Sequence, residues 1–342
     1  MKKDPIIFYQ YFATTDLDYF KELLVKRFKE TGHDREIEFR TWVCDDDIPM
    51  KDGDIYCYDA FVLKFLVDNG YIQQLPEIID TSDVFPWILE TTKANQKTYG
   101  FPWMLCFDSL ISRKEDAKFH NDESVLQDNV VMALGTFAPL YFYSTSSLMM
   151  ESLPLEKGED ITKRKAFKQL MHLAELTGDV DAAFKYHYQE QEYLSQFIEG
   201  KKRFIAQFPE IISSFPEGDY ALSHLNFLTP QADETKLYYV DFVSVGKNVR
   251  EEKLLDCLDI MEIICSGEFI YDICVPNGKP SFMCPPLNSL YPKLSKLSSV
   301  YDNLYDIVKD PNNSAVRYKT NYYDIVAQLT EEIFKAVPLY GE

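Results

Sequence analysis

The first part of the chain alternates strand-like apolar runs with helical segments. Residues 6–12 (Ile-Ile-Phe-Tyr-Gln-Tyr-Phe) predict a first strand. In residues 16–31 the apolar positions recur every three or four residues, which predicts an amphipathic helix. Residues 36–43 alternate polar and apolar side chains, as a half-buried strand does. A short strand over 54–60 and a helix over 60–69 follow. This β-α-β-β-α order predicts the first half of an open α/β sheet.

The rest of the chain continues the alternation of strands and helices. The elements expected after residue 100 are strands over 105–113 and 236–245 and helices over 160–177, 184–199, 220–228, 250–266, 291–309 and 322–336. The mixture indicates an α/β protein. A chain of 342 residues with 46% hydrophobic content is long enough for two domains.

The acidic composition argues against two classes of partner. The chain has 35 Lys and Arg against 55 Asp and Glu, a net charge of −20. Such a field repels nucleic acid and anionic membranes, and it attracts a small cationic ligand. No run of 18 apolar residues is present, so no membrane span is expected. The N-terminus shows no secretory leader, so we expect a cytoplasmic protein, or a secreted one if a signal peptide has been removed.

The seven cysteines do not have the spacing of a metal site. No CxxC or Cys/His pair matches a zinc motif, and the acidic run 45–47 lacks calcium-loop spacing, so no metal is expected. Cys265, Cys274 and Cys284 lie near apolar or turn residues, which favours small buried residues or a disulfide. With 13 glycines and no glycine-rich phosphate loop, a nucleotide-binding fold has little support.

One cysteine lies in a segment of a different kind. Residues 99–108 (Tyr-Gly-Phe-Pro-Trp-Met-Leu-Cys-Phe-Asp) are too short and too interrupted by Pro102 for a helix. They suit an extended segment that crosses between domains. The thiol of Cys106 is either a buried spacer or a nucleophile. A nucleophilic thiol reacts as the thiolate, so it needs a neighbouring base or positive charge.

Polar side chains at the ends of the predicted strands are further candidates. In open α/β sheets, ligands bind at the carboxyl ends of the strands. By that rule Tyr9, Tyr11, Tyr58 and Asp59 are candidate site residues. The alternative for each tyrosine is an aromatic position at the edge of the core.

The order of elements resembles a type II periplasmic-binding-protein fold, with two α/β lobes around a central cleft and crossings between them. Within it, Pro102-Trp103-Met104-Leu105-Cys106 resembles the cysteine segment of thiaminase I, the thiamine pyridinylase family. Shorter matching patches are Phe8-Tyr9-Gln10-Tyr11, Tyr58-Asp59-Ala60, Phe215-Pro216-Glu217 and Tyr239-Val240-Asp241-Phe242. The domains expected from this resemblance are a first lobe of residues 1–108 and about 243–300, a second lobe of about 109–242, and C-terminal helices over about 301–342 that pack on the lobes.

The resemblance implies a transferase reaction on thiamine. Cys106 would attack C6 of the pyrimidine ring, the thiazole would leave the methylene, and an organic base or a thiol would take its place. Glu217 would be the general base, but the Phe-Pro before it departs from the family pattern, so Glu210 and Glu234 are rivals. The residues implied to bind substrate are Asp59 and Asp241 at the aminopyrimidine, and Tyr9 or Tyr11, Tyr58, Trp103 and Tyr239 along the cleft.

Two functions of another class remain as alternatives. The protein could be a non-catalytic binding protein for thiamine or a related pyrimidine, or a sugar-binding protein that stacks its ligand on Trp42, Trp87 and Trp103. The presence of Cys106 favours the enzyme. The implied reaction requires no cofactor, and we expect a monomer whose partners are thiamine and a small nucleophilic co-substrate.

Overall fold

The chain forms two compact units. The computed structural model describes residues 3–11, 16–42, 48–75, 79–149, 151–187, 190–225, 236–315 and 322–339. Unit 1 comprises Met1–Cys106 and Tyr238–Tyr322, and unit 2 comprises Phe107–Leu237 and Tyr323–Glu342. The chain therefore leaves unit 1 directly after Cys106. The acidic run 45–47 and Glu234 lie outside the described residues.

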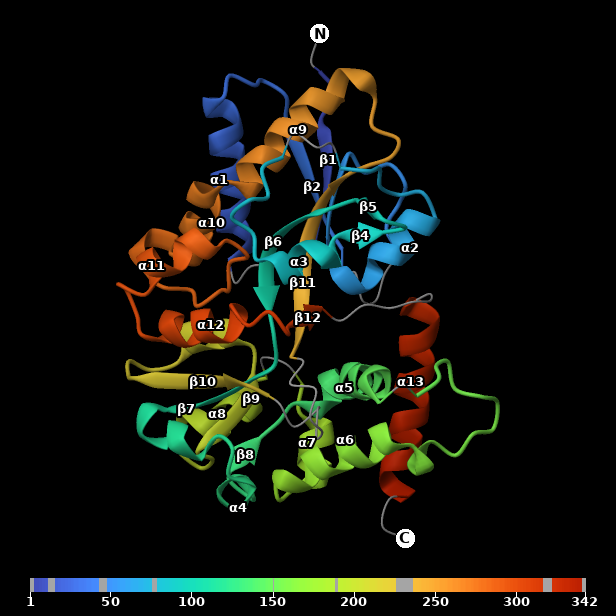
Figure 1. Ribbon diagram of the computed structural model, residues 1–342, viewed down its shortest axis with the longest axis vertical. Helices are drawn as coiled ribbons and strands as arrows, with labels where there is room; N and C mark the ends of the chain where they lie inside the picture. Colours follow the sequence, from blue (N-terminus) through green and yellow to red (C-terminus); the bar gives the residue numbers. More distant parts are fainter. Residues whose placement is uncertain are drawn as a thin grey trace. The chain divides into compact units, whose positions relative to one another are not determined.

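Unit 1 is built on a six-stranded mixed sheet (Figure 1). Its strands are β1 (Ile6–Gln10), β2 (Ile37–Thr41), β3 (Ile55–Asp59), β6 (Phe101–Cys106), β11 (Leu237–Val245) and β12 (Ser314–Ala315). The order is β12-β11-β3-β1-β2, and β6 also pairs with β11. Strand β1 is parallel to β2 and β3, whereas β11 is antiparallel to β3 and β6. A small hairpin of β4 (Lys93–Ala94) and β5 (Lys97–Thr98) lies apart from this sheet.

Helices cover this sheet because their apolar stripes match its apolar faces. The helices of unit 1 are α1 (Leu17–Glu30), α2 (Leu63–Asp68), α3 (Pro86–Thr91), α9 (Glu251–Cys265), α10 (Gly267–Cys274), α11 (Tyr291–Leu294) and α12 (Val300–Val308). Asp16 caps α1 by accepting a hydrogen bond from the backbone of Tyr19. Phe20 of α1 is buried, and its ring lies 5.3 Å from that of Trp103 and 5.5 Å from that of Phe269. Helices α1 and α9 lie side by side (Figure 1).

A buried ion pair fixes α9 to the sheet. The Nζ of Lys253 lies 2.7 Å from Asp54 Oδ2 and 2.6 Å from the carbonyl oxygen of Pro5. The same Asp54 oxygen accepts a hydrogen bond from the backbone of Ile7 in β1. Both charged side chains are more than nine-tenths buried. One carboxylate thus connects α9, β1 and the start of β3.

Unit 2 has a four-stranded sheet of order β10-β7-β9-β8. Its strands are β7 (Ser109–Arg113), β8 (Val130–Val131), β9 (Phe204–Gln207) and β10 (Tyr220–His224). Its helices are α4 (Glu123–Leu126), α5 (Leu134–Leu148), α6 (Lys165–Leu176), α7 (Val180–Lys185), α8 (Gln191–Ile198) and α13 (Tyr322–Ala336). Helix α5 packs against α6 and α7 (Figure 1). A 3₁₀-helix, η4 (Pro209–Ser214), follows β9.

The predicted α/β class is confirmed, and three predicted elements are wrong. The first part of the helix expected over 220–228 is instead strand β10, because Tyr220 to His224 pair with β7, and residues 226–228 lie outside the described residues. The helix expected over 291–309 is divided into α11 and α12 by a turn. The strand expected over 105–113 ends at Cys106, and a separate strand, β7, starts at Ser109.

The C-terminal helices are divided between the two units, since α12 belongs to unit 1 and α13 to unit 2. No helix in the described part of the chain is both long and apolar enough to cross a bilayer.

Candidate active site

The register of β11 gathers four of the predicted site residues. Strand β11 lies beside β6 (Figure 1) and pairs on its other edge with β3. In these pairings Asp241 lies opposite Asp59, and Tyr239 lies opposite Cys106. Residues directly opposite one another in an antiparallel pair project to the same face of the sheet, as do residues two apart in one strand. The side chains of Asp59, Asp241, Tyr239 and Cys106 therefore share one face of the unit 1 sheet.

A β-bulge determines that Cys106 projects to this face. In the pairing of β6 with β11, Pro102 lies opposite Phe242 but Met104 lies opposite Asp241, so Trp103 is the additional residue of a bulge. An extra residue shifts the alternation of side chains by one position. Without it, Leu105 rather than Cys106 would share the face of Asp241. Pro102 is compatible with this strand because bulges tolerate the missing backbone donor.

Cys106 is the accessible thiol of the described chain. The structure describes six cysteines, of which Cys106 is partly exposed and the other five are buried. Burial raises the pKa of the Cys57, Cys257 and Cys265 thiols well above the ordinary value. A buried neutral thiol is a poor nucleophile, whereas an accessible one can be deprotonated and can meet a substrate. Cys274 is likewise buried, and burial raises its pKa too.

The two carboxyl groups beside Cys106 are almost fully buried. Asp59 is 3% exposed and Asp241 is 5% exposed. Asp59 ends β3 and accepts a hydrogen bond from the backbone of Phe61, which starts the 3₁₀-helix η1 (Ala60–Val62). Two carboxyl groups side by side in a buried sheet form an acidic surface that favours a cationic or hydrogen-bond-donating ligand.

Trp103 contacts Cys57, which lies on the same sheet face as Asp59. Its side chain is fully buried, and its Nε1–H donates to Cys57 Sγ at 3.3 Å. Burial raises the pKa of Cys57 most, and the negative charges of Asp241 and Asp59 add to that rise. The backbone of Tyr11 hydrogen-bonds the same thiol. Cys57 is therefore a neutral thiol that accepts a hydrogen bond from the Trp103 indole.

The structure does not bring Tyr9 and Tyr58 to the face that carries Cys106. They alternate with Gln10 and Asp59, so they project to the opposite face. The Tyr58 hydroxyl lies 2.7 Å from Ser244 Oγ and the side chain is fully buried. The Tyr9 hydroxyl donates to Asp52 at 3.0 Å and its ring stacks on Tyr56. Both tyrosines are core residues, while Tyr11 is partly exposed.

In unit 2 the candidate bases differ in their surroundings. Glu217 is exposed on the turn before β10. Glu210 lies in η4, and burial raises its pKa to about 7, with a further contribution from the negative charge of Asp108. Asp108 is 4% exposed and accepts a hydrogen bond from the Tyr141 hydroxyl at 2.9 Å. Asp108 is not among the site residues predicted from the sequence. The available signal was a lone carboxylate two residues after Cys106 in apolar surroundings.

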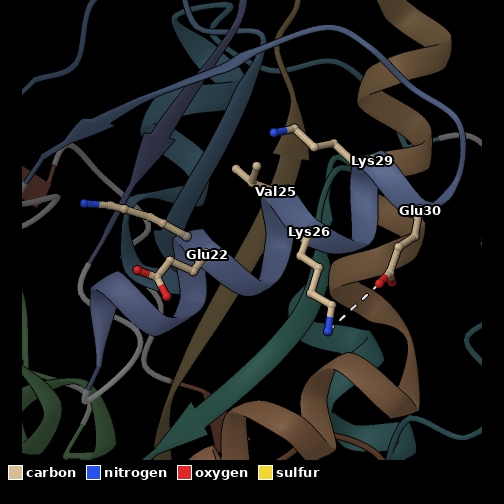
Figure 2. Close-up of a pocket in the computed structure, with 6 residues that line it drawn as sticks. Glu22, Val25, Lys26, Lys29 and Glu30 are labelled. Carbon is tan, nitrogen blue, oxygen red and sulfur yellow. Dashed lines mark ion pairs between the residues drawn. The ribbon is translucent and has the colours of Figure 1, made fainter.

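Grooves elsewhere on unit 1 have no nucleophile. One lies along the exposed side of α1 and is lined by Lys21, Glu22, Val25, Lys26, Lys29 and Glu30. Figure 2 shows these side chains spreading from a single helix, with Lys26 and Glu30 paired at 3.9 Å. A second groove lies between α1 and α9, where His33 bridges Asp256 and Asp259. Within the described residues, no three His, Cys, Asp or Glu side chains gather into a metal site.

The fold of the chain is similar to that of solved binding proteins and of thiaminase I. The chain has the α/β fold of periplasmic binding proteins: an ABC substrate-binding protein from Listeria monocytogenes in complex with cycloalternan matches with a TM-score of 0.65 and 13% identity, over 98% of this chain and 100% of that one. The thiaminase I of Clostridium botulinum in complex with thiamin is more similar, with a TM-score of 0.81 and 21% identity over 97% of this chain and 100% of that one.

Sequence comparison points to the same relatives. The chain is 24% identical to thiaminase-1 of Paenibacillus thiaminolyticus over 323 residues, which cover 82% of this chain and 76% of that protein. No family model matches the chain. The predicted resemblance to thiaminase I, in sequence and in a periplasmic-binding-protein-like fold, is therefore confirmed.

Proposed function

We propose that this protein is a thiamine-degrading transferase of the thiaminase I type. The observation that carries the proposal is the accessible thiol of Cys106 on the same sheet face as the buried pair Asp59 and Asp241. The similarity to thiaminase I over most of the chain supports it. The substrates would be thiamine and a small nucleophile, either an organic base or a thiol.

The first step is attack by Cys106 on the pyrimidine ring. A general base takes the thiol proton, and the thiolate adds to C6, forming the carbon–sulfur bond. The electron pair displaced from the ring moves to a ring nitrogen. A base with a pKa near the working pH suits this role, and the pKa of Glu210 is raised to about 7. Glu217, the base that the resemblance implies, is exposed and is the alternative for this role.

The acidic pair stabilises the adduct. A carboxyl group of the Asp59–Asp241 pair donates a proton or a hydrogen bond to the ring nitrogen that receives the electron pair. That pair then returns toward the methylene and breaks its bond to the thiazolium nitrogen. The thiazole leaves as a neutral molecule with the bonding electrons. The base first releases the thiol proton to solvent. The second nucleophile then adds to the methylene and gives its proton, where it has one, to the regenerated base, and expulsion of the Cys106 thiolate restores the ring.

Charge and aromatic surface both suit this substrate. The thiazolium ring of thiamine is a cation, and the chain has a net charge of −20. Tyr239, on the Cys106 face, offers an aromatic ring near the reacting centre. Aromatic faces attract both flat rings and positive charge. Tyr11 is partly exposed just beyond the end of β1 and is assigned the same role.

The second candidate is a binding protein without catalysis. Its support is the fold, since ABC substrate-binding proteins share it. A partly exposed cysteine next to two buried carboxyl groups is not needed for reversible binding, and this observation favours the enzyme. The sugar-binding hypothesis loses all three of its stacking surfaces, because Trp42, Trp87 and Trp103 are buried in the core.

Replacing Cys106 separates the two functions. The protein is incubated with thiamine and pyridine, and release of the thiazole is followed by chromatography. We expect wild type to release thiazole and Cys106→Ala to fall to the rate without protein, because no other described thiol is accessible. Cys265→Ala, which changes a buried thiol in α9, is the matched control and should keep its activity. Equal rates for wild type and Cys106→Ala, with tight thiamine binding in both, would identify a binding protein.

A further inference from the structure

Gln10 is a buried polar side chain that the protein itself leaves unsatisfied. Its side chain is 0% exposed, and among the described residues neither its Nε2 nor its Oε1 has a hydrogen-bond partner. The other buried glutamine, Gln207, uses its Oε1 to accept from the backbone of Phe208. An unpaired buried amide lowers stability, so such a group is expected to meet a water or a ligand.

The position of Gln10 relates it to the acidic pair. It is the last residue of β1, and β1 is parallel to β3 with Phe8 beside Ile55. Two residues further along each strand, Gln10 and Cys57 therefore project to the same face. Asp59 follows Cys57 on that face, opposite Asp241. Gln10 thus belongs to the same sheet face, at the carboxyl end of its strand, where ligands bind in open α/β sheets.

The chemistry of an aminopyrimidine requires a donor as well as acceptors. Its polar edge presents an amino group, which donates, between ring nitrogens, which accept. An ionised carboxylate only accepts hydrogen bonds, so it can satisfy the amino group but not a ring nitrogen. A carboxamide offers both functions side by side, which is why Asn and Gln pair with the matching edge of adenine. Gln10 supplies this combination, and neither atom has a hydrogen-bond partner among the described residues.

We propose that Gln10 is a specificity-determining residue that binds the aminopyrimidine of the substrate. Its Nε2 donates to a ring nitrogen and its Oε1 accepts from the amino group, while the Asp59–Asp241 pair takes the remaining polar groups. This inference rests on the proposed function, since it names how the same site selects its substrate. It predicts that a pyrimidine with an oxo group in place of the amino group is rejected, because the acceptor of Gln10 then meets another acceptor.

The test measures binding without turnover. Cys106→Ala serves as the parent protein, and calorimetry gives its Kd for thiamine and for the oxo analogue of thiamine. Gln10→Met is then added, since methionine has a similar volume and no amide. The matched control is Gln73→Met, a glutamine of unit 1 whose amide donates to the backbone of Gly246. The melting temperature of each variant is recorded alongside.

We expect Gln10→Met to weaken thiamine binding about tenfold or more, as loss of a buried hydrogen-bonding pair does. The preference for thiamine over the oxo analogue should shrink by a similar factor, while Gln73→Met leaves both affinities unchanged. The melting temperature should not fall, because an unsatisfied amide is removed from the core. Gln10→Glu keeps the size and an acceptor but lacks the donor, and should also bind thiamine weakly.

Other outcomes overturn the inference in distinguishable ways. Unchanged affinity and preference, with a lower melting temperature, would show that Gln10 holds an internal water. If Gln10→Met fails to fold, an unchanged preference in Gln10→Glu would have the same meaning. If the parent binds no thiamine and wild type releases no thiazole, the proposed function fails and this inference with it. Thiazole release by wild type together with unaltered binding in both Gln10 variants refutes the inference alone.

Discussion

At the scale of single residues, the proposed chemistry depends on how the protein surrounds each ionisable group. Cys106 is accessible while the cysteines around it are buried and held neutral. Partial burial and the negative charge of Asp108 raise the pKa of Glu210 to about 7. Glu217, seven residues later, is exposed. A pKa near neutrality suits a general base, and this property supports Glu210 for the role.

Glu210→Gln should lower the rate of thiazole release by about 10²–10⁴-fold and leave the Kd for thiamine nearly unchanged, because a general base acts on the reaction and not on binding. Glu217→Gln, at an exposed site, is the matched control and should stay near wild-type activity. In wild type, kcat/KM should fall as the pH drops below about 7, when Glu210 becomes protonated. A strong loss in Glu217→Gln with normal activity in Glu210→Gln would reverse this assignment.

The same carboxyl group should make stability depend on pH. The pKa of Glu210 is raised from 4.5 to about 7 in the folded protein, so between these values the folded state binds the extra proton. Its contribution to the free energy of unfolding is present below pH 4.5 and is lost as the pH rises through about 7. Glu210→Gln should therefore raise the melting temperature at pH 8 and leave it unchanged at pH 4. A lower melting temperature at pH 8 would contradict this reading.

At the scale of elements, strand pairing places the site. The bulge at Trp103 and the pairing of β11 with β3 and β6 bring Cys106 and Asp241 to one face. A shift of one residue in either pairing would move one of them to the opposite face. The position of β1 and β3 is in turn fixed to α9 through the buried pair of Lys253 and Asp54. The positions of the site residues are therefore set by the pairing and packing of these elements.

Lys253→Met should lower the free energy of unfolding by about 3–5 kcal/mol, because it leaves the carboxylate of Asp54 buried without its partner. Adding Asp54→Asn should restore part of the loss, since the lone charge is then removed. Urea denaturation followed by circular dichroism measures both. Lys335→Met, which breaks only the exposed pair with Glu331 on α13, is the control and should change little. Equal small effects of the two lysine substitutions would show that the buried pair does not fix α9.

At the scale of the whole molecule, the acidic charge acts on the substrate at longer range than any single contact. The net charge of −20 surrounds the protein with a negative field. Such a field raises the encounter rate of a cation and leaves a neutral molecule unaffected. Thiamine is cationic, whereas pyridine is neutral near pH 7. The two substrates should therefore respond differently to salt.

Raising sodium chloride from 10 mM to 200 mM should lower kcat/KM for thiamine several-fold, because the Debye length falls from about 30 Å to below about 10 Å. The KM for pyridine should not change, and this provides the internal control. Steady-state kinetics of thiazole release at fixed pH measures both. No change for thiamine would show that the charge serves solubility and not substrate capture.

The sequence by itself determined the elements with strong local signals and the candidate chemistry. Periodic apolar positions predicted α1, α9 and α13, and the apolar runs predicted β1, β3 and β11. These succeed because each pattern is repeated over many residues within one segment. The resemblance around Cys106 likewise pointed to thiaminase I, which the comparisons confirm.

Only the tertiary structure decided the identity of strands that depend on a partner, the face of each side chain and the burial of each carboxyl group. Residues 220–224 became a strand because β7 lies beside them. Tyr9 and Tyr58 project away from Cys106 because register and a bulge, which involve distant strands, set the faces. Glu210 is more buried than Glu217 because of the packing around it, and this burial raises the pKa of Glu210. Pairing, facing and burial are relations between distant segments, so no local pattern in the sequence contains them.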